Sequence, residues 1–264
     1  MSFDYEQSIW GRGVATLNHA DPTAFRLEQS LQALAGLPAD AKALEVGCGA
    51  GQFIRAIKQI HSSWECVGTD ISVKALDIAK EIGGDISFVE QSPEQLPFAD
   101  NTYSAVLVYD VLEHASNPEA LLKEINRVLK PNGILYCFVP CEGDRLSVWR
   151  YLRLFAQWHD MTEKHAGHIN HWSRDTWWRT ILSAGYTVQS VRYSEHVFGQ
   201  LAGVIAFWLM DRAARKGVQT NNEEYFSKDN RFSAVRKFLN SLIYWESELL
   251  KRIPSPNVHF VCKK

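Results

Sequence analysis

Three glycines, Gly47, Gly49 and Gly51, stand at alternate positions between a short apolar run and an amphipathic stretch, Gln52–Ile60. This order predicts a strand, a tight turn and a helix. Glycine accepts positive φ angles and lets a ligand approach the backbone closely, and the start of the helix offers free N–H groups. With the acid Glu45 just before the first glycine, the turn is a candidate ligand site.

Asp70 ends a second strand-like run, Trp64–Thr69, roughly 20 residues after the glycine turn, where an acid can accept hydrogen bonds from ribose hydroxyls. Gln52 stands where a dinucleotide site would have its third glycine, and no phosphate-loop lysine follows. The spacing therefore predicts an adenosine-type pocket rather than a dinucleotide or triphosphate site.

At this point the chain resembles a known family. Glu45–Gly51 looks like the first motif of the class I S-adenosylmethionine (SAM)-dependent methyltransferases, and Leu96–Phe98, Tyr103–His114 and Arg127–Gly133 look like later motifs of its small-molecule branch, which includes quinone-biosynthesis methyltransferases. The resemblance covers Ala41–Pro140 closely. It implies SAM as cofactor and a small or medium, rather hydrophobic or aromatic acceptor, methylated at oxygen or nitrogen. C-methylation of a quinone-like ring and a non-catalytic SAM-binding partner protein are the alternatives.

The resemblance also implies which residues meet the cofactor. Ile71 is suited to pack on adenine, and Tyr109 should border the reacting methyl group. Ser92 stands where the family often has an aspartate that accepts the adenine amino proton, and Pro93 removes a backbone N–H. Ser92 Oγ or Gln91 is expected to substitute. The full set of predicted cofactor contacts is Glu45, Gly47, Gly49, Gly51, Asp70, Ile71, Ser92 and Tyr109.

Strand and helix signals alternate along the chain, which predicts an α/β fold: a Rossmann-like, seven-stranded, mostly parallel sheet with helices on both faces. Ser72, Asn117 and Ser173 are candidate N-caps of three of the helices. The expected strands are Lys42–Val46, Trp64–Thr69, Ile86–Glu90, Tyr103–Tyr109, Gly133–Val139, Tyr186–Tyr193 and Val258–Cys262.

We expect one domain over residues 1–264, with its core at about 22–193 and 257–264 and an N-terminal flap at 1–20. Two insertions interrupt this plan, Cys141–Trp172 and Ser194–Pro256. The second is far longer than an ordinary loop. Its apolar residues recur at helical spacing: Phe232, Val235, Phe238, Leu239, Leu242, Leu249, Leu250 and Ile253.

Histidines supply the candidate catalytic groups, since an oxygen acceptor must lose a proton. His168 and His171 lie in a tryptophan-rich stretch that could form a substrate wall, and His114 follows the fourth strand. The spacing of His165, His168 and His171 matches no standard zinc motif, so we predict no metal site.

The uncharged run Val197–Met210 is too short to span a bilayer. We expect it to form a lid or core helix, with contact to a membrane surface or to a second copy of the chain as alternatives. The net charge of −2 argues against a nucleic-acid partner. Five scattered cysteines and the lack of a signal segment at the start of the chain favour a cytoplasmic protein.

Overall fold

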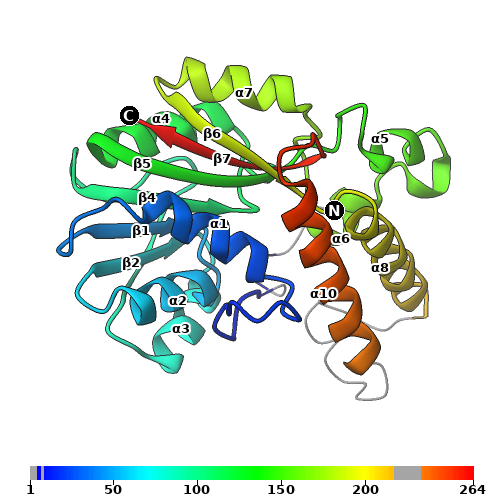
Figure 1. The fold of residues 1–264 in the computed structure, drawn as a ribbon, viewed down its shortest axis with the longest axis horizontal. Helices are drawn as coiled ribbons and strands as arrows, with labels where there is room; N and C mark the ends of the chain where they lie inside the picture. The colour runs from blue at the N-terminus through cyan, green and yellow to red at the C-terminus, as the bar shows by residue number, and fades with distance from the viewer. Residues whose placement is uncertain (1–4, 7–8, 217–232) are drawn as a thin grey trace.

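The computed structural model describes residues 5–6, 9–216 and 233–264. A seven-stranded sheet forms its centre, with strand order β3-β2-β1-β4-β5-β7-β6 (Figure 1). This confirms the predicted fold class. The strands are β1 (Lys42–Val46), β2 (Glu65–Asp70), β3 (Ser87–Glu90), β4 (Tyr103–Tyr109), β5 (Leu129–Pro140), β6 (Thr187–Ser194) and β7 (Asn257–Lys263).

The sheet is parallel from β3 to β5, whereas β7 runs antiparallel to both neighbours, β5 and β6. The order of strands reverses between β1 and β4. In an open α/β sheet the ligand crevice forms at such a reversal, at the carboxyl ends of the strands. The glycine turn follows β1, and Asp110 follows β4, so the topology brings them to the same edge.

Alternate residues of the central strands face two separate cores, as the strand period of two requires. Val106 and Val108 of β4 pack under α4 (Pro118–Val128) and α7 (Arg174–Ser183). Ala105 and Leu107 face the other way, toward α1 (Ala24–Leu34) and α2 (Gln52–Ile60). Because both faces are covered, the β4 side chains are buried throughout.

The three predicted N-caps are confirmed. Ser72, Asn117 and Ser173 each accept a backbone hydrogen bond at the start of α3 (Val73–Ile82), α4 and α7. The strand boundaries lie within one residue of the predicted ones except at the start of β5, which begins at Leu129 rather than Gly133. Pairing with β4 slips after Leu129, and Asn132 has a φ of +64°, so the predicted turn is an irregularity within the strand.

The first insertion contains α5 (Val148–Leu152), a 3₁₀ turn (Ala156–Trp158) and α6 (Met161–Ala166), and the second contains α8 (Phe198–Ala214) and α10 (Ser233–Leu250). Figure 1 shows α6 and α8 side by side beyond the end of the sheet, and α10 lies along α8 and β6. Phe232, predicted within this helical stretch, lies outside the described residues. Within 5–6, 9–216 and 233–264, no helix is long and apolar enough to cross a membrane.

Candidate active site

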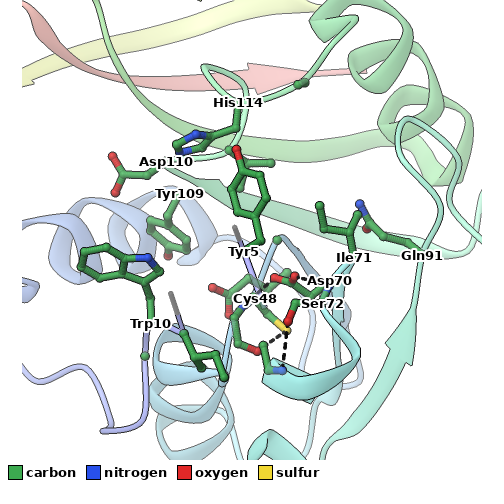
Figure 2. A pocket seen from close by; sticks show the side chains of 18 of the residues that line it. Tyr5, Trp10, Cys48, Asp70, Ile71, Ser72, Gln91, Tyr109, Asp110 and His114 are labelled. Carbon is green, nitrogen blue, oxygen red and sulfur yellow. Dashed lines mark hydrogen bonds between the residues drawn. The ribbon is translucent and has the colours of Figure 1, made fainter. Parts of the chain in front are cut away.

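A cavity of about 550 Å³ opens at the carboxyl ends of β1, β2 and β4 (Figure 2). At one end it is lined by the glycine turn, Asp70 and Ile71, and at the other by His114 and His168. Both insertions contribute to it: Ala166 and His168 come from the first, and Phe207 of α8 comes from the second. The cavity therefore joins the sheet edge to the two insertions.

The glycine turn is folded tightly against the end of β2 and against the N-terminal segment. Gly47 and Cys48 donate their N–H groups to Thr69 O, at 2.7 and 3.0 Å, and Ala50 N donates to Trp10 O at 2.8 Å. Gly49 has a φ of +53°, and a Cβ there would lie 2.8 Å from Trp10 O. The close approach at Gly49 is thus made by the chain itself.

Two acids stand beside this turn. Glu45 Oε2 accepts from Ile54 N at 2.7 Å, and burial raises the pKa of Glu45 to about 8. Asp70 accepts from Gly49 N at 2.7 Å through Oδ2 and from Ser72 N at 2.9 Å through Oδ1. Burial also raises the pKa of Asp70. Each carboxylate oxygen of Asp70 keeps a second acceptor position, so this side chain could also hold ribose hydroxyls.

The middle of the cavity is held by a bridge between α1 and the end of β4. The Arg26 guanidinium lies over the Phe138 ring and contacts Asp110 and Glu195. Asp110 has a φ of +51°, which is uncommon for a non-glycine residue. Next to it, Tyr109 stacks on Phe53 with 3.9 Å between ring centroids.

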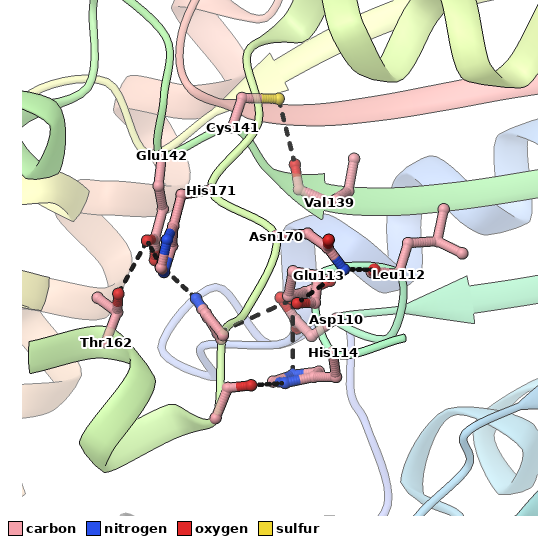
Figure 3. A network of polar contacts seen from close by, with 12 residues as sticks. Asp110, Leu112, Glu113, His114, Val139, Cys141, Glu142, Thr162, Asn170 and His171 are labelled. Atoms are coloured by element: carbon pink, nitrogen blue, oxygen red, sulfur yellow. Dashed lines mark hydrogen bonds and ion pairs between the residues drawn. The ribbon is translucent and has the colours of Figure 1, made fainter. Parts of the chain in front are cut away.

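At the far end, the segment after α6 is tied to the loop after β4 (Figure 3). Asn170 Nδ2 donates to Leu112 O and Ala115 O, and Asn170 N donates to Glu113 O. These bonds bring the His168 ring within 4.9 Å of the His114 ring, centroid to centroid.

The two histidines are anchored differently. Nδ1 of His114 lies 3.0 Å from Gly167 O, and Nδ1 of His168 lies 2.6 Å from Glu142 Oε1. Burial, followed by the charge of His168, lowers the pKa of His114 to about 3. Burial also opposes the charge on His168, but Glu142 and then Glu113 outweigh it and raise its pKa to about 9. At neutral pH His114 is therefore neutral and His168 is charged.

The structure brings together most of the residues predicted from the sequence. Three predicted residues are not among the described residues that line the cavity. Gly51 caps α2 with a φ of +91° and packs on Phe88, Ser92 is exposed beside the cavity, and His171 is turned toward Glu142. Those that do line it are Glu45, Gly47, Gly49, Asp70, Ile71, Tyr109, His114 and His168.

Residues 44–137 match the family described as methyltransferase domain. Over 210 residues the chain is 29% identical to an uncharacterized methyltransferase of Schizosaccharomyces pombe, covering 74% of this chain and 73% of that protein. It is 35% identical over 106 residues to a demethylmenaquinone methyltransferase of Staphylococcus aureus, covering 39% of this chain and 44% of that protein. The domain match, the relatives and the sheet order together support a class I SAM-dependent methyltransferase.

Solved structures share the fold of this methyltransferase at low identity. The [4+2]-cyclase SpnF gives a TM-score of 0.61 at 16% identity, covering 97% of this chain and 86% of that chain. A geranyl diphosphate methyltransferase gives a TM-score of 0.57 at 15% identity, and the match covers 90% of this chain and 77% of that chain. The chain spans less than half the length of the demethylmenaquinone methyltransferases that it matches.

Sequence reasoning missed several residues of the methyltransferase cavity. Arg26 lines it, yet this residue carries no motif signal beyond its charge. Gln91, which the sequence offered beside Ser92 for the adenine edge, lines the cavity as well. Glu113 is 1% exposed, and its Oε1 lies 3.8 Å from His114 Nε2 and 3.9 Å from His168 Nε2, on the side of the two rings away from the cavity. An acid beside Leu112 in an apolar run was the only hint of that burial in the sequence.

Proposed function

We propose that this enzyme transfers the methyl group of SAM to a small or medium, hydrophobic or aromatic acceptor, at oxygen or at nitrogen. The observation that supports this most directly is a single continuous cavity. Asp70 lies at the end that suits a nucleoside, and His114, His168 and Phe207 line the other end. C-methylation of a quinone-like ring is the second candidate, because relatives include demethylmenaquinone methyltransferases.

In this proposal the cofactor ribose binds Asp70, its adenine packs on Ile71, and its methionine half lies by the glycine turn and Tyr109. Glu45 lines the same wall, and the positive charge of SAM would favour its ionised form, which burial alone disfavours. Gln91 is the group best placed for the adenine edge. It is 7% exposed, lines the cavity, and its buried Oε1 has no hydrogen-bond partner in the part of the chain that the structure describes.

Methyl transfer forms a bond from the acceptor atom to carbon as the S–CH₃ bond breaks, which leaves a neutral thioether. An oxygen acceptor must also lose its proton. His114 is the candidate acceptor of that proton, because its Nδ1 faces Gly167 O and its Nε2 keeps a lone pair. A pKa of about 3 makes it a weak base by itself. His168, charged and held by Glu142, is placed to orient the acceptor.

The test is a methyl-transfer assay with labelled SAM and a panel of phenols, amines and quinols. Phe207→Asp should lower turnover of apolar acceptors at least tenfold while SAM affinity stays within twofold, because Phe207 lies at the acceptor end. Phe155→Asp, at a 61% exposed position of the first insertion, is the matched control and should change neither. Unchanged turnover in the Phe207 variant would overturn the placement of the acceptor.

A hydrophobic acceptor also gives a role to α8. Phe198, Leu201, Ile205 and Trp208 recur on one face of this helix and are 42–57% exposed, and Arg212 and Arg215 follow at its end. We propose contact of this face with an anionic membrane surface, from which the acceptor enters. Sedimentation with anionic vesicles should fall in Ile205→Glu. A concentration-dependent dimer that the same change dissociates would instead assign the face to a second copy.

A further inference from the structure

Three potential metal ligands meet at the acceptor end of the cavity. Glu113 Oε1 lies 3.8 Å from His114 Nε2 and 3.9 Å from His168 Nε2, and the ligand atoms of the three residues all lie within 4.8 Å of one another. Two imidazole nitrogens and one carboxylate oxygen form a donor set that zinc and similar divalent ions favour.

The carboxylate of Glu113 makes no hydrogen bond among the described residues, and its nearest potential ion-pair partners there are the two histidines themselves. Its side chain is 1% exposed, and neither Oε1 nor Oε2 has a hydrogen-bond partner there. A buried carboxylate that makes no hydrogen bond is costly to a fold. A cation bound by Glu113 would remove that cost.

The Nδ1 atom of each histidine, which would not bind the ion, already has a hydrogen-bond partner of the kind found in metal sites. Ligating histidines in proteins almost always donate the second ring N–H to a carboxylate or a backbone carbonyl. Here Nδ1 of His168 meets Glu142 Oε1 at 2.6 Å, and Nδ1 of His114 meets Gly167 O at 3.0 Å. Both Nε2 atoms therefore face Glu113.

Supporting contacts fix this geometry from the first insertion. Glu142 is buried, and its other oxygen accepts from Thr162 Oγ1 at 2.9 Å and pairs with Arg153. Glu142 thus holds His168 through Nδ1, the ring nitrogen that does not face Glu113. Ligand atoms around a tetrahedral ion are about 3.4 Å apart, so the gaps to Glu113 need to close by about half an ångström.

We infer that Glu113, His114 and His168 form a binding site for a zinc-type divalent metal ion, with its open position facing the cavity. His114 and His168 line the cavity and Glu113 lies behind them, so a fourth ligand would come from the cavity side. The sequence-based expectation of no metal weighed His165, His168 and His171, and the fold brings a different set together. This step rests on the proposed function: the fourth ligand is the acceptor's hydroxyl oxygen, and the ion would lower the pKa of that hydroxyl so that its proton passes to solvent. With the ion bound, His168 gives up its Nε2 proton, and His114 and His168 act as ligands rather than as base and charged orienting group.

Direct metal binding tests this inference without methyl transfer. Chelator-treated protein should bind one Zn²⁺ per chain by calorimetry, and one Co²⁺ with the visible absorption of a four- or five-coordinate site. Glu113→Gln and His168→Asn should lower the Zn²⁺ affinity at least 100-fold, and Glu142→Gln, which acts through His168, should lower it 10–100-fold. His61→Asn, on a histidine stacked on Trp64 at the end of α2, is the control and should match the wild type.

SAM affinity serves as the folding control, since Glu113 does not belong to the cofactor end. If chelator-treated wild type binds no Zn²⁺, or if the Glu113 and His168 variants bind it as the wild type does while still binding SAM, the metal site is wrong. Methyl transfer by the metal-free enzyme would leave the proposed function standing without the metal. Metal binding at these residues without any methyl transfer would remove the proposed function and keep the site.

Discussion

Arg26 Nη1 lies 2.6 Å from Asp110 Oδ2, which links the first helix of the sheet domain to the strained residue at the end of β4. The same guanidinium reaches Glu195 Oε1 at 3.1 Å, just after β6. One cation therefore connects three segments that are far apart in the sequence and fixes the wall between the two ends of the cavity.

Arg26→Met should lower the free energy of unfolding by about 1–2 kcal/mol, because two carboxylates lose their cation. This is less than the 3–5 kcal/mol of a fully buried pair, since the Asp110 side chain is 36% exposed. Urea denaturation measures it. Lys123→Met removes only the surface pair with Glu119 and should cost less than 0.5 kcal/mol. Equal losses in the two variants would show that the Arg26 bridge is no more than a surface pair.

Asp70→Ala should weaken SAM binding by at least tenfold, because hydrogen bonds to a charged acceptor are worth about 1.5–3 kcal/mol each. Calorimetry with SAM and with a 2′-deoxy analogue separates ribose contacts from damage to the turn, since Asp70 also holds Gly49 N. The variant should discriminate less between the two ligands than the wild type. Asp77→Ala, on the exposed side of α3, is the control. Wild-type affinity in Asp70→Ala would refute the ribose assignment.

Gln91→Ala should weaken SAM binding about 2–10-fold, the range for loss of one neutral hydrogen bond. Ser92→Ala should leave the affinity within twofold, because Ser92 is exposed and outside the cavity lining. The pair of variants decides between the two groups that the sequence left open for the adenine edge. A loss in Ser92→Ala alone would return the role to Ser92.

His259 should make the fold sensitive to acid. It is fully buried, lies 2.7 Å from Tyr136 OH and 2.8 Å from Ser194 Oγ, and burial holds its pKa well below the ordinary 6.5. Below pH 6.5 the unfolded chain takes up a proton that the folded chain refuses, so stability falls by up to about 1.4 kcal/mol per pH unit. His259→Gln should remove this contribution, so the free energy of unfolding should fall less steeply between pH 6 and pH 5 than in the wild type, by up to about 1.4 kcal/mol per pH unit.

Ser194→Ala is the control for that slope. It removes a partner of His259 without removing the titrating ring, so it should lower stability by a similar amount at pH 7.5 and pH 5.5. Denaturant titrations at several pH values measure both variants. A His259→Gln slope equal to that of the wild type would show that other groups control the acid response.

The sheet could be predicted because its signals are local. The largely apolar run Tyr103–Tyr109, the glycine turn and the capping residues each depend on neighbours in sequence. The cofactor end follows from the same strand ends. The acceptor end depends on contacts such as that of Asn170 Nδ2 with Ala115 O, which no periodicity reveals. For that reason His168 and His171 were equal candidates in the sequence, although only His168 lines the cavity.

The position of β7 has a consequence for how the protein is made. β7 fills the gap between β5 and β6, and β6 pairs with no other strand of the described sheet. Until residues 257–263 leave the ribosome, β5 and β6 both expose unpaired edges of the kind that drive aggregation. Fragments that stop before Asn257 should therefore depend on chaperones and precipitate on their own, even though they contain every residue that lines the cavity.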